Sequence, residues 1–230
     1  MSNMPLTDGI NALTRYANET TGASDTTLSD AVESLVAGYG GGGGGFADCL
    51  DFSAGNIQAL IAHGSEYIMT DYMGTGNEIF GAKFMSISAV TYEHFWSMAF
   101  SNNKYDMQRG GASWNVDTMV RGTTSIDRLA ITSGTPFVKA AGALGYSAMT
   151  PTKSLAIFAG YYNNNLESQL SKATFYGLNL VNANGEYIAR FMPWLENGTP
   201  CVKDLISGSI YYNAGSGAFG YIDAEGVTHD

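Results

Sequence analysis

Hydrophobic positions repeat with a helical period over the first 38 residues. Four apolar residues recur at spacings of three and four, which places them on one face of a helix: Leu6, Ile10, Leu13 and Ala17. Thr27 and Asp30 have the spacing of a capping box at the start of a second helix. One face of this helix is apolar and consists of Leu28, Ala31, Val32, Leu35 and Val36, and Gly38 ends the helix. Helices this short are marginal in water. We therefore expect residues 1–38 to be a helical attachment and oligomerisation element.

The hydrophobic pattern changes to alternation after residue 46. Strand-length runs rich in aromatic and β-branched residues are separated by Gly, Asn, Asp or Ser, as in "NEIFGAKFMSI", "KSLAIFAGYY", "ATFYGLNLVN" and "EYIARFMP". In the third run, alternation predicts that Tyr176 and Leu178 share one face and Phe175 and Gly177 the other. Asn184–Gly185 is a strong hairpin signal. About a dozen short strands predict a mainly β fold, a two-sheet antiparallel sandwich or jelly roll, over residues 46–230.

Six consecutive glycines, Gly40 to Gly45, separate these two patterns. Glycine loses more backbone freedom on ordering than any other residue, so such a run is unsuited to a folded element. A flexible run of this length spans roughly 13 Å. Residues 39–45 are therefore predicted to be a linker that holds a β domain away from a helical anchor.

The chain is acidic, with 11 basic and 21 acidic residues and a net charge of −10. This charge argues against binding to nucleic-acid backbones. Basic amphipathic stretches, runs of transmembrane length and a signal-peptide pattern at the N-terminus are all missing from the sequence. We expect a protein made in the cytoplasm, without membrane insertion, that stays soluble unless it leaves by lysis as part of a particle.

Candidate metal, thiol and nucleotide chemistry is sparse. Cys49 and Cys201 are expected to be buried thiols, with a bridge between neighbouring terminal strands as the alternative. The three histidines have no metal-ligand spacing: His94 is expected to be half-buried and His229 to lie in a frayed tail, and His63 stands alone. Gly-x-Gly-x-x-Gly occurs at 38–43 and 215–220 without the helix that would hold a pyrophosphate.

Two segments resemble known families. "ALTRYANETTGASDTTLSDAVESLVAGYGGGG" resembles the N-terminal segment of tail and other virion proteins of phages and prophages of Firmicutes. Residues from about 64 onward resemble the concanavalin A-like, LamG-type jelly roll of such proteins. The entry strand, "GSEYIMTDYMGTGNEIFGAKF", and the exit segment, "ATFYGLNLVNANGEYIARFMP … VKDLISGSIYYNAGSGAF", carry most of that match. The framework of the exit segment is Arg190, Phe191, Pro193, Asp204 and residues 213–219, and Trp194 is a departure from it. The resemblance implies that Asp204 fixes a turn and that Asn213 to Phe219 closes the last hairpin.

Concanavalin A-like domains include glycoside hydrolases, which need two carboxylates facing each other across a groove. On a strand this requires alternating acids, and no run here has them. Glu66 with Asp71, and Glu186 alone, come nearest. No catalytic residue is assigned. The superfamily also allows a calcium ion, but no Asp-rich loop is present, so neither a metal nor another cofactor is assigned.

Sugar binding in a shallow groove uses an aromatic face with amide groups beside it. Four loops carry both, around Asn102, Asn103 and Tyr105, around Trp114 and Asn115, at residues 161–165, and around Trp194, Glu196 and Asn197. Asn clusters are also ordinary turn residues, and aromatic rings also fill sandwich cores. The candidate ligand-binding residues are Trp114, Asn115, Tyr161, Tyr162, Asn163, Asn164 and Asn165.

The resemblance implies a non-enzymatic protein of the virion, on the tail or capsid surface. Residues 5–37 would bind other virion proteins and form a homo-oligomer, with a trimer favoured, and the jelly roll would bind a host cell-surface glycan. A purely architectural decoration protein is the alternative. A glycoside hydrolase is the third hypothesis.

Overall fold

The computed structural model describes a mainly β protein. It covers residues 49–75, 78–87, 92–100, 103–110, 114–120, 126–141, 151–162, 165–166 and 170–230. These residues form strands and no helix, so none of the described part is a helix that could span a membrane. The helices predicted in residues 1–38 and the linker at 39–45 lie outside the described residues.

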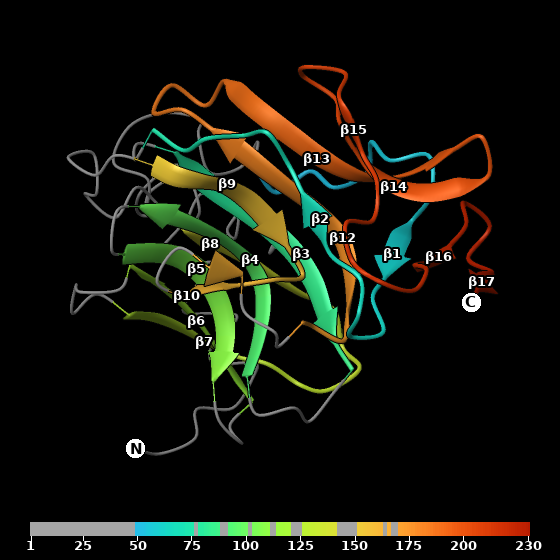
Figure 1. Cartoon of the computed structure of the whole chain (residues 1–230), viewed down its shortest axis with the longest axis horizontal. Coiled ribbons are helices and arrows are strands. Elements are labelled where there is room, and N and C mark those ends of the chain that lie inside the picture. Colours follow the sequence, from blue (N-terminus) through green and yellow to red (C-terminus); the bar gives the residue numbers. More distant parts are fainter. Residues whose placement is uncertain are drawn as a thin grey trace, which may run out of the picture.

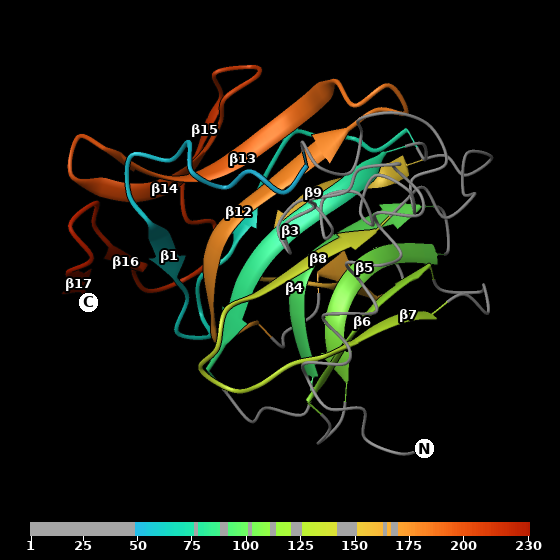
Figure 2. The same ribbon diagram turned by 180° about the vertical axis from the view of Figure 1, so that it is seen from behind.

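One antiparallel sheet has six strands. Their order is β2 (Ile68–Met69), β9 (Pro151–Ile157), β4 (Tyr92–Phe100), β5 (Asn103–Gly110), β6 (Asn115–Val120) and β7 (Ile126–Ala130). The short hairpin of β10 (Tyr161–Tyr162) and β11 (Asn165–Leu166) is separate from it. Figures 1 and 2 show β4 to β7 curving side by side.

The other antiparallel sheet has nine strands. Its main path is β15 (Ile210–Tyr211), β14 (Thr199–Asp204), β13 (Tyr187–Glu196), β12 (Ala173–Val181), β1 (Ala59–Ile61), β16 (Gly220–Ile222) and β17 (Thr228–His229). β3 (Ile79–Ser86) pairs with the whole length of β12 and also with β8 (Phe137–Ala141). The opposite edge of β12 is therefore shared: β1 pairs near Phe175, and β13 pairs from Leu178 onward. This change of partner falls at Tyr176 and Gly177.

A single aromatic core joins the two sheets. Phe80 on β3 stacks on Trp96 on β4, with ring centroids 4.4 Å apart. Phe84 contacts the rings of Phe95, Phe158 and Phe175. All of these rings are buried, and burial of large rings dominates the stability of such cores. The predicted pair of antiparallel β-sheets is thus confirmed in its coarse form.

Strict alternation along β12 was a wrong prediction. The register shifts between Phe175 and Gly177, so that Phe175 and Leu178 both lie in the core. A bulge of this kind adds one residue to a strand and turns the following side chains to the other face. Tyr176 is left on the outer face, where it lines a cavity described below.

The predicted turns had mixed outcomes. Asn184–Gly185 lies in the β12–β13 turn, as predicted, with the Asn182 side chain accepting hydrogen bonds from the backbone N–H groups of Asn184 and Glu186. Asp204 does fix a turn, because its carboxylate accepts hydrogen bonds from the backbone N–H groups of Ile206 and Ser207.

The prediction that Asn213 to Phe219 closes the last hairpin was wrong. β15 pairs with β14 and β16 pairs with β1, so the segment connects separated strands of the sheet. Asn213 fixes its course by accepting a hydrogen bond from the Tyr67 N–H. The last hairpin is β16–β17, and His229 lies in β17 rather than in a frayed tail.

Both cysteines are buried and free, as predicted. Burial raises the pKa of Cys201 to about 11, so its reactive thiolate is scarce at neutral pH. We expect neither thiol of the folded protein to react with Ellman's reagent at pH 8, and both to react after unfolding in guanidinium. Rapid reaction of either thiol in the native protein would contradict the burial described here.

Candidate functional site

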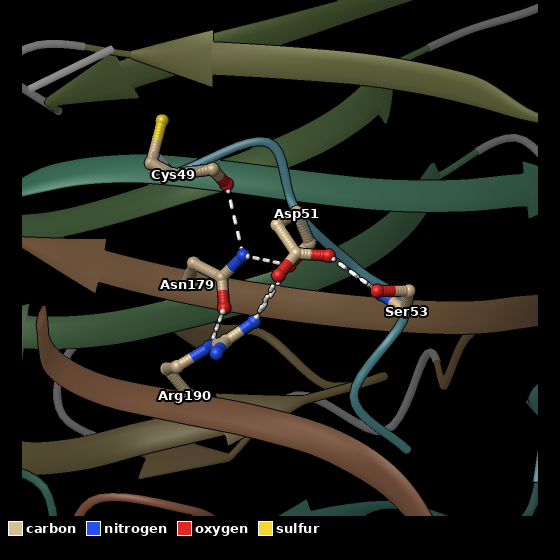
Figure 3. Close-up of polar contacts among 5 residues, drawn as sticks. All are labelled: Cys49, Asp51, Ser53, Asn179 and Arg190. Atoms are coloured by element: carbon tan, nitrogen blue, oxygen red, sulfur yellow. Dashed lines mark hydrogen bonds and ion pairs between the residues drawn. The ribbon is translucent and has the colours of Figure 1, made fainter. Parts of the chain in front are cut away.

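Residues 49–58, here called the strap, cross the outer face of the nine-stranded sheet. The side-chain amide of Asn179 on β12 holds the start of the strap: its Nδ2 donates to the carbonyl oxygens of Cys49 (3.0 Å) and Asp51 (2.7 Å). Figure 3 shows this amide between the strap and β13. A buried amide with these bonds provides donors for backbone carbonyl groups of the strap, which is not itself a strand.

Arg190 on β13 completes the attachment. Its Nη2 donates to the Asp51 carboxylate (2.9 Å) and its Nε to Oδ1 of Asn179 (3.3 Å). The hydrogen bonds from Ser53, and then Arg190, hold the pKa of Asp51 below its usual range. The guanidinium carbon lies 4.3 Å from the centre of the Tyr187 ring, which supports the cation on its other side. Figure 3 shows Arg190 and Ser53 on opposite sides of Asp51.

Two glycines allow the strap to lie close to the sheet. An added Cβ at Gly81 on β3 would overlap the carbonyl group of Cys49. An added Cβ at Gly55 would lie 2.6 Å from the carbonyl oxygen of Pro193 on β13. Both obstacles are backbone atoms, so a larger side chain at either position would displace the strap.

The second half of the strap is bound on both sides. The Asn56 side chain donates to the Leu195 carbonyl (3.1 Å) and accepts from the Leu195 N–H (2.7 Å), as a neighbouring strand would. Gln58 donates from its side-chain amide to the Ala224 carbonyl (3.0 Å) and from its backbone to Ile222. The strap thereby spans β13 and β16 beside the point where β12 changes partner.

A cavity of about 400 Å³ lies along this part of the strap. The strap forms one wall, and β3, β12 and the turn after β16 form the other. Its lining residues are Phe52, Ser53, Gly55, Asn56, Ile57, Gln58, Lys83, Tyr176 and Ala224. Ser53, Asn56, Gln58 and Ala224 are exposed to solvent, so the cavity is accessible.

The lining combines apolar surface with hydrogen-bonding groups. Phe52 and Tyr176 supply aromatic surface, and Lys83 Nζ lies 4.9 Å from the centre of the Tyr176 ring. Burial raises the pKa of Tyr176, which keeps its hydroxyl protonated and able to donate at neutral pH. Gln58 uses its amide nitrogen on Ala224, which leaves its carbonyl oxygen as an acceptor.

Most of the binding residues predicted from the sequence lie elsewhere and apart from one another. The Trp114 ring lies 4.6 Å from the Arg109 guanidinium carbon, on the side of the six-stranded sheet that faces β3. Asn115 starts β6, opposite Ala130 on β7. Tyr162 pairs with Asn165, which is exposed, in the β10–β11 hairpin. Asn163 and Asn164 lie outside the described residues.

Tyr161 is unsuited to a binding role. It is only 2% exposed and packs against Ala99, Ala156 and Ala159, on the other side of the six-stranded sheet from Trp114. Its hydroxyl donates to the Ser154 carbonyl (3.1 Å), and burial raises its pKa to about 12. The predicted group is therefore split between two faces, and this ring offers no open face to a ligand.

The carboxylates that came nearest to a catalytic pair are bound locally. Glu66 accepts hydrogen bonds from the His63 N–H (2.7 Å) and from Ser65, and these outweigh the effect of burial and lower its pKa. Asp71 accepts from the Tyr211 hydroxyl. Glu186 accepts from Asn182 (2.7 Å) in the turn before β13.

The histidines each lie beside one carboxylate. His94 is fully buried, not half-buried as predicted, with Nδ1 3.2 Å from Asp106. His229 lies 2.7 Å from Asp223, and His63 lies 3.7 Å from Asp230. Within the described ranges, no three His, Cys, Asp or Glu side chains gather as metal ligands would.

Sequence reasoning missed Lys83, Tyr176 and the strap. One signal was present: a glycine inside a strand pattern, here Gly177, marks a bulge or a close backbone approach. An added Cβ at Gly177 would lie 2.9 Å from the Phe52 ring, so this glycine adjoins both the bulge and the strap.

The chain was compared with known proteins, and no family model, no curated protein and no solved structure matches it.

Proposed function

We propose that the chain is a non-enzymatic saccharide-binding protein of a phage particle. Its β domain is a concanavalin A-like jelly roll, and residues 5–37 attach it to other virion proteins as a homo-oligomer. The cavity beneath the strap is the saccharide site. Host-surface glycan is its ligand, and the tail or capsid surface is its location.

The observation that carries this proposal is the character of the cavity. Aromatic rings at Phe52 and Tyr176 adjoin a hydroxyl, amides and one ammonium group in an open space of about 400 Å³. Saccharides need apolar surface for their C–H faces and many hydrogen-bonding partners for their hydroxyls. The two antiparallel sheets with one shared core are consistent with a jelly roll.

Two further observations support binding without catalysis. Glu66, Asp71 and Glu186 are each held by local hydrogen bonds, and the residues that the structure describes around the cavity include no carboxylate. The placement in a virion rests on the resemblance of residues 12–43 to phage tail and virion proteins. Display of several copies would raise avidity by roughly 10²–10⁴ without new contacts.

Replacing Tyr176 with Ala is expected to weaken saccharide binding by about tenfold, because it removes aromatic surface and a hydroxyl from the cavity. The full chain and the variant are compared on an array of bacterial wall polysaccharides. Tyr212→Ala is the matched control, since Tyr212 is 49% exposed and does not line the cavity.

The array also separates the hypotheses. Binding that Tyr176→Ala weakens and Tyr212→Ala does not would support the saccharide site. Silence of the wild-type chain across the array would overturn the proposal in favour of an architectural virion protein. Release of sugar from wall material would instead favour a hydrolase.

A further inference from the structure

The charge of the cavity is opposite to the charge of the chain. The protein carries a net charge of −10, yet among the described residues that line the cavity there is one cation, Lys83, and no acid. The carboxylate of Asp51, close by on the strap, is already paired with Arg190. Within the described part of the chain, an anion entering the cavity would therefore meet a lysine and no opposing carboxylate.

Lys83 is held in place by a ring and not by an acid. Its Nζ lies 4.9 Å from the centre of the Tyr176 ring, and it forms no salt bridge with another described residue. A cation–π contact orients the ammonium while leaving its N–H groups able to donate. An acidic partner would have used the same donors, so the ring leaves Lys83 available to a ligand.

The same feature occurs nearby, away from this cavity. Lys203 on β14 has its Nζ 4.4 Å from the centre of the Trp194 ring, and neither residue lines the cavity. Lys83 and Lys203 are thus similar cations on one sheet, and of the two only Lys83 borders the cavity described here. Comparing variants of these two lysines therefore distinguishes the effect of a positive charge inside the cavity on ligand binding from the effect of the overall charge of the protein.

We infer that the cavity selects acidic saccharides, with a carboxylate or phosphate group of the sugar bound by the ammonium of Lys83. This inference rests on the proposed saccharide-binding function and specifies its ligand class. The Tyr176 hydroxyl donates a second hydrogen bond to the acid group, and the C–H face of the sugar contacts Phe52. A charge-assisted hydrogen bond is stronger than a neutral one.

The test uses acidic sugars with neutral counterparts of the same skeleton. Isothermal titration of the full chain compares oligogalacturonates with their methyl esters, and glucose 6-phosphate with glucose, alongside the array ligands. We expect the acidic member of a pair to bind about tenfold more tightly. The carboxylate pair and the phosphate pair then show which acid group the site takes.

Three variants complete the test. Lys83→Met keeps most of the unbranched apolar stem but removes the ammonium, and should abolish the preference for the acidic member. Lys83→Arg should keep that preference, and Lys203→Met should leave it unchanged. Saccharide binding with equal or better affinity for the neutral members would overturn this inference and leave the proposed function standing. Failure of every saccharide, acidic or neutral, would overturn both.

Discussion

Replacing Arg109 with Met is expected to lower the free energy of unfolding by about 3–5 kcal/mol at neutral pH. Arg109 is 1% exposed, and its Nε donates to Oε2 of Glu93 (3.2 Å). The same oxygen accepts from Ser86 Oγ (2.6 Å), so the ion pair joins β4 and β5 to β3 of the other sheet. Methionine matches the apolar stem but leaves the Glu93 carboxylate buried without its cation.

The loss should depend on pH in a defined direction. Burial raises the pKa of Glu93 despite the opposing effects of Ser86 and Arg109. Because the pKa of Glu93 is raised in the folded state, its ionised form opposes folding. The contribution of Glu93 to the free energy of unfolding is therefore greatest below its unfolded-state pKa of 4.5. That contribution is lost as the pH rises through the folded-state pKa. Without Arg109 this pKa rises further. The destabilisation of Arg109→Met should therefore shrink as the pH is lowered from 7 towards 4.5.

Urea unfolding at several pH values measures this effect. Glu93→Gln combined with Arg109→Met should recover part of the lost stability at neutral pH, because no buried charge remains. Arg128→Met is the matched control, since Arg128 is 59% exposed and its solvent-screened pair with Asp117 should contribute little to stability. A loss that is independent of pH and not recovered in the double variant would assign the destabilisation to packing alone.

Alternation predicted the strands well because it is a local property. The runs around residues 79–86, 151–157 and 187–196 are strands β3, β9 and β13. Each carries enough β-branched and aromatic residues to be recognised without its neighbours. The turn at Asn184–Gly185 is similarly local, since Gly185 has the positive φ of 83° that such turns require.

Pairing between distant segments could not be predicted in the same way. The loop at 213–219 has the composition of a hairpin, but its two flanking strands pair with β14 and β1 instead. The composition of a segment indicates whether the chain can turn there. It contains no information about which strand will pair with the next one in the sheet. The bulge in β12 is a second example, because its position depends on where β1 ends and β13 begins.

The candidate site was missed for a related reason. Tyr161 and Trp114 lie in polar loops, and polarity suggested exposure, but Tyr161 is covered and Trp114 packs on Arg109. The cavity instead joins residues 52–58 to Lys83 and Tyr176, segments about 25 and 120 residues apart along the chain. No rule of residue spacing connects such segments, because they are brought together by the hydrogen bonds of the strap and not by a sequence repeat.

Asn179→Ala is expected to release the start of the strap and to weaken saccharide binding by at least about tenfold. Asn179 is fully buried and donates to the Cys49 and Asp51 carbonyl groups, and it accepts from Arg190. Removing it takes one hydrogen-bond partner from each of these groups, at a cost of about 2–3 kcal/mol in the free energy of unfolding. The cavity loses its wall because Phe52 to Gln58 follow directly along the strap.

The thiols provide a readout specific to the strap. Cys49 begins the strap, whereas Cys201 lies on β14. Release of the strap should therefore make Cys49 react with Ellman's reagent under native conditions while Cys201 stays protected. Peptide mapping of the labelled protein identifies which thiol reacted. A merely global loss of stability would expose both thiols together.

Asn182→Ala is the matched control for this prediction. Asn182 also bonds to the backbone, in the turn between β12 and β13, but it does not contact the strap. The variant should lose some stability and keep both the protected Cys49 and the saccharide affinity. If Asn179→Ala also keeps both, the strap is held by Arg190 and Asn56 without this amide. The cavity would then depend on the sheet-side bonds of Asn56 and Gln58, and the segment before Asp51 could move without changing the site.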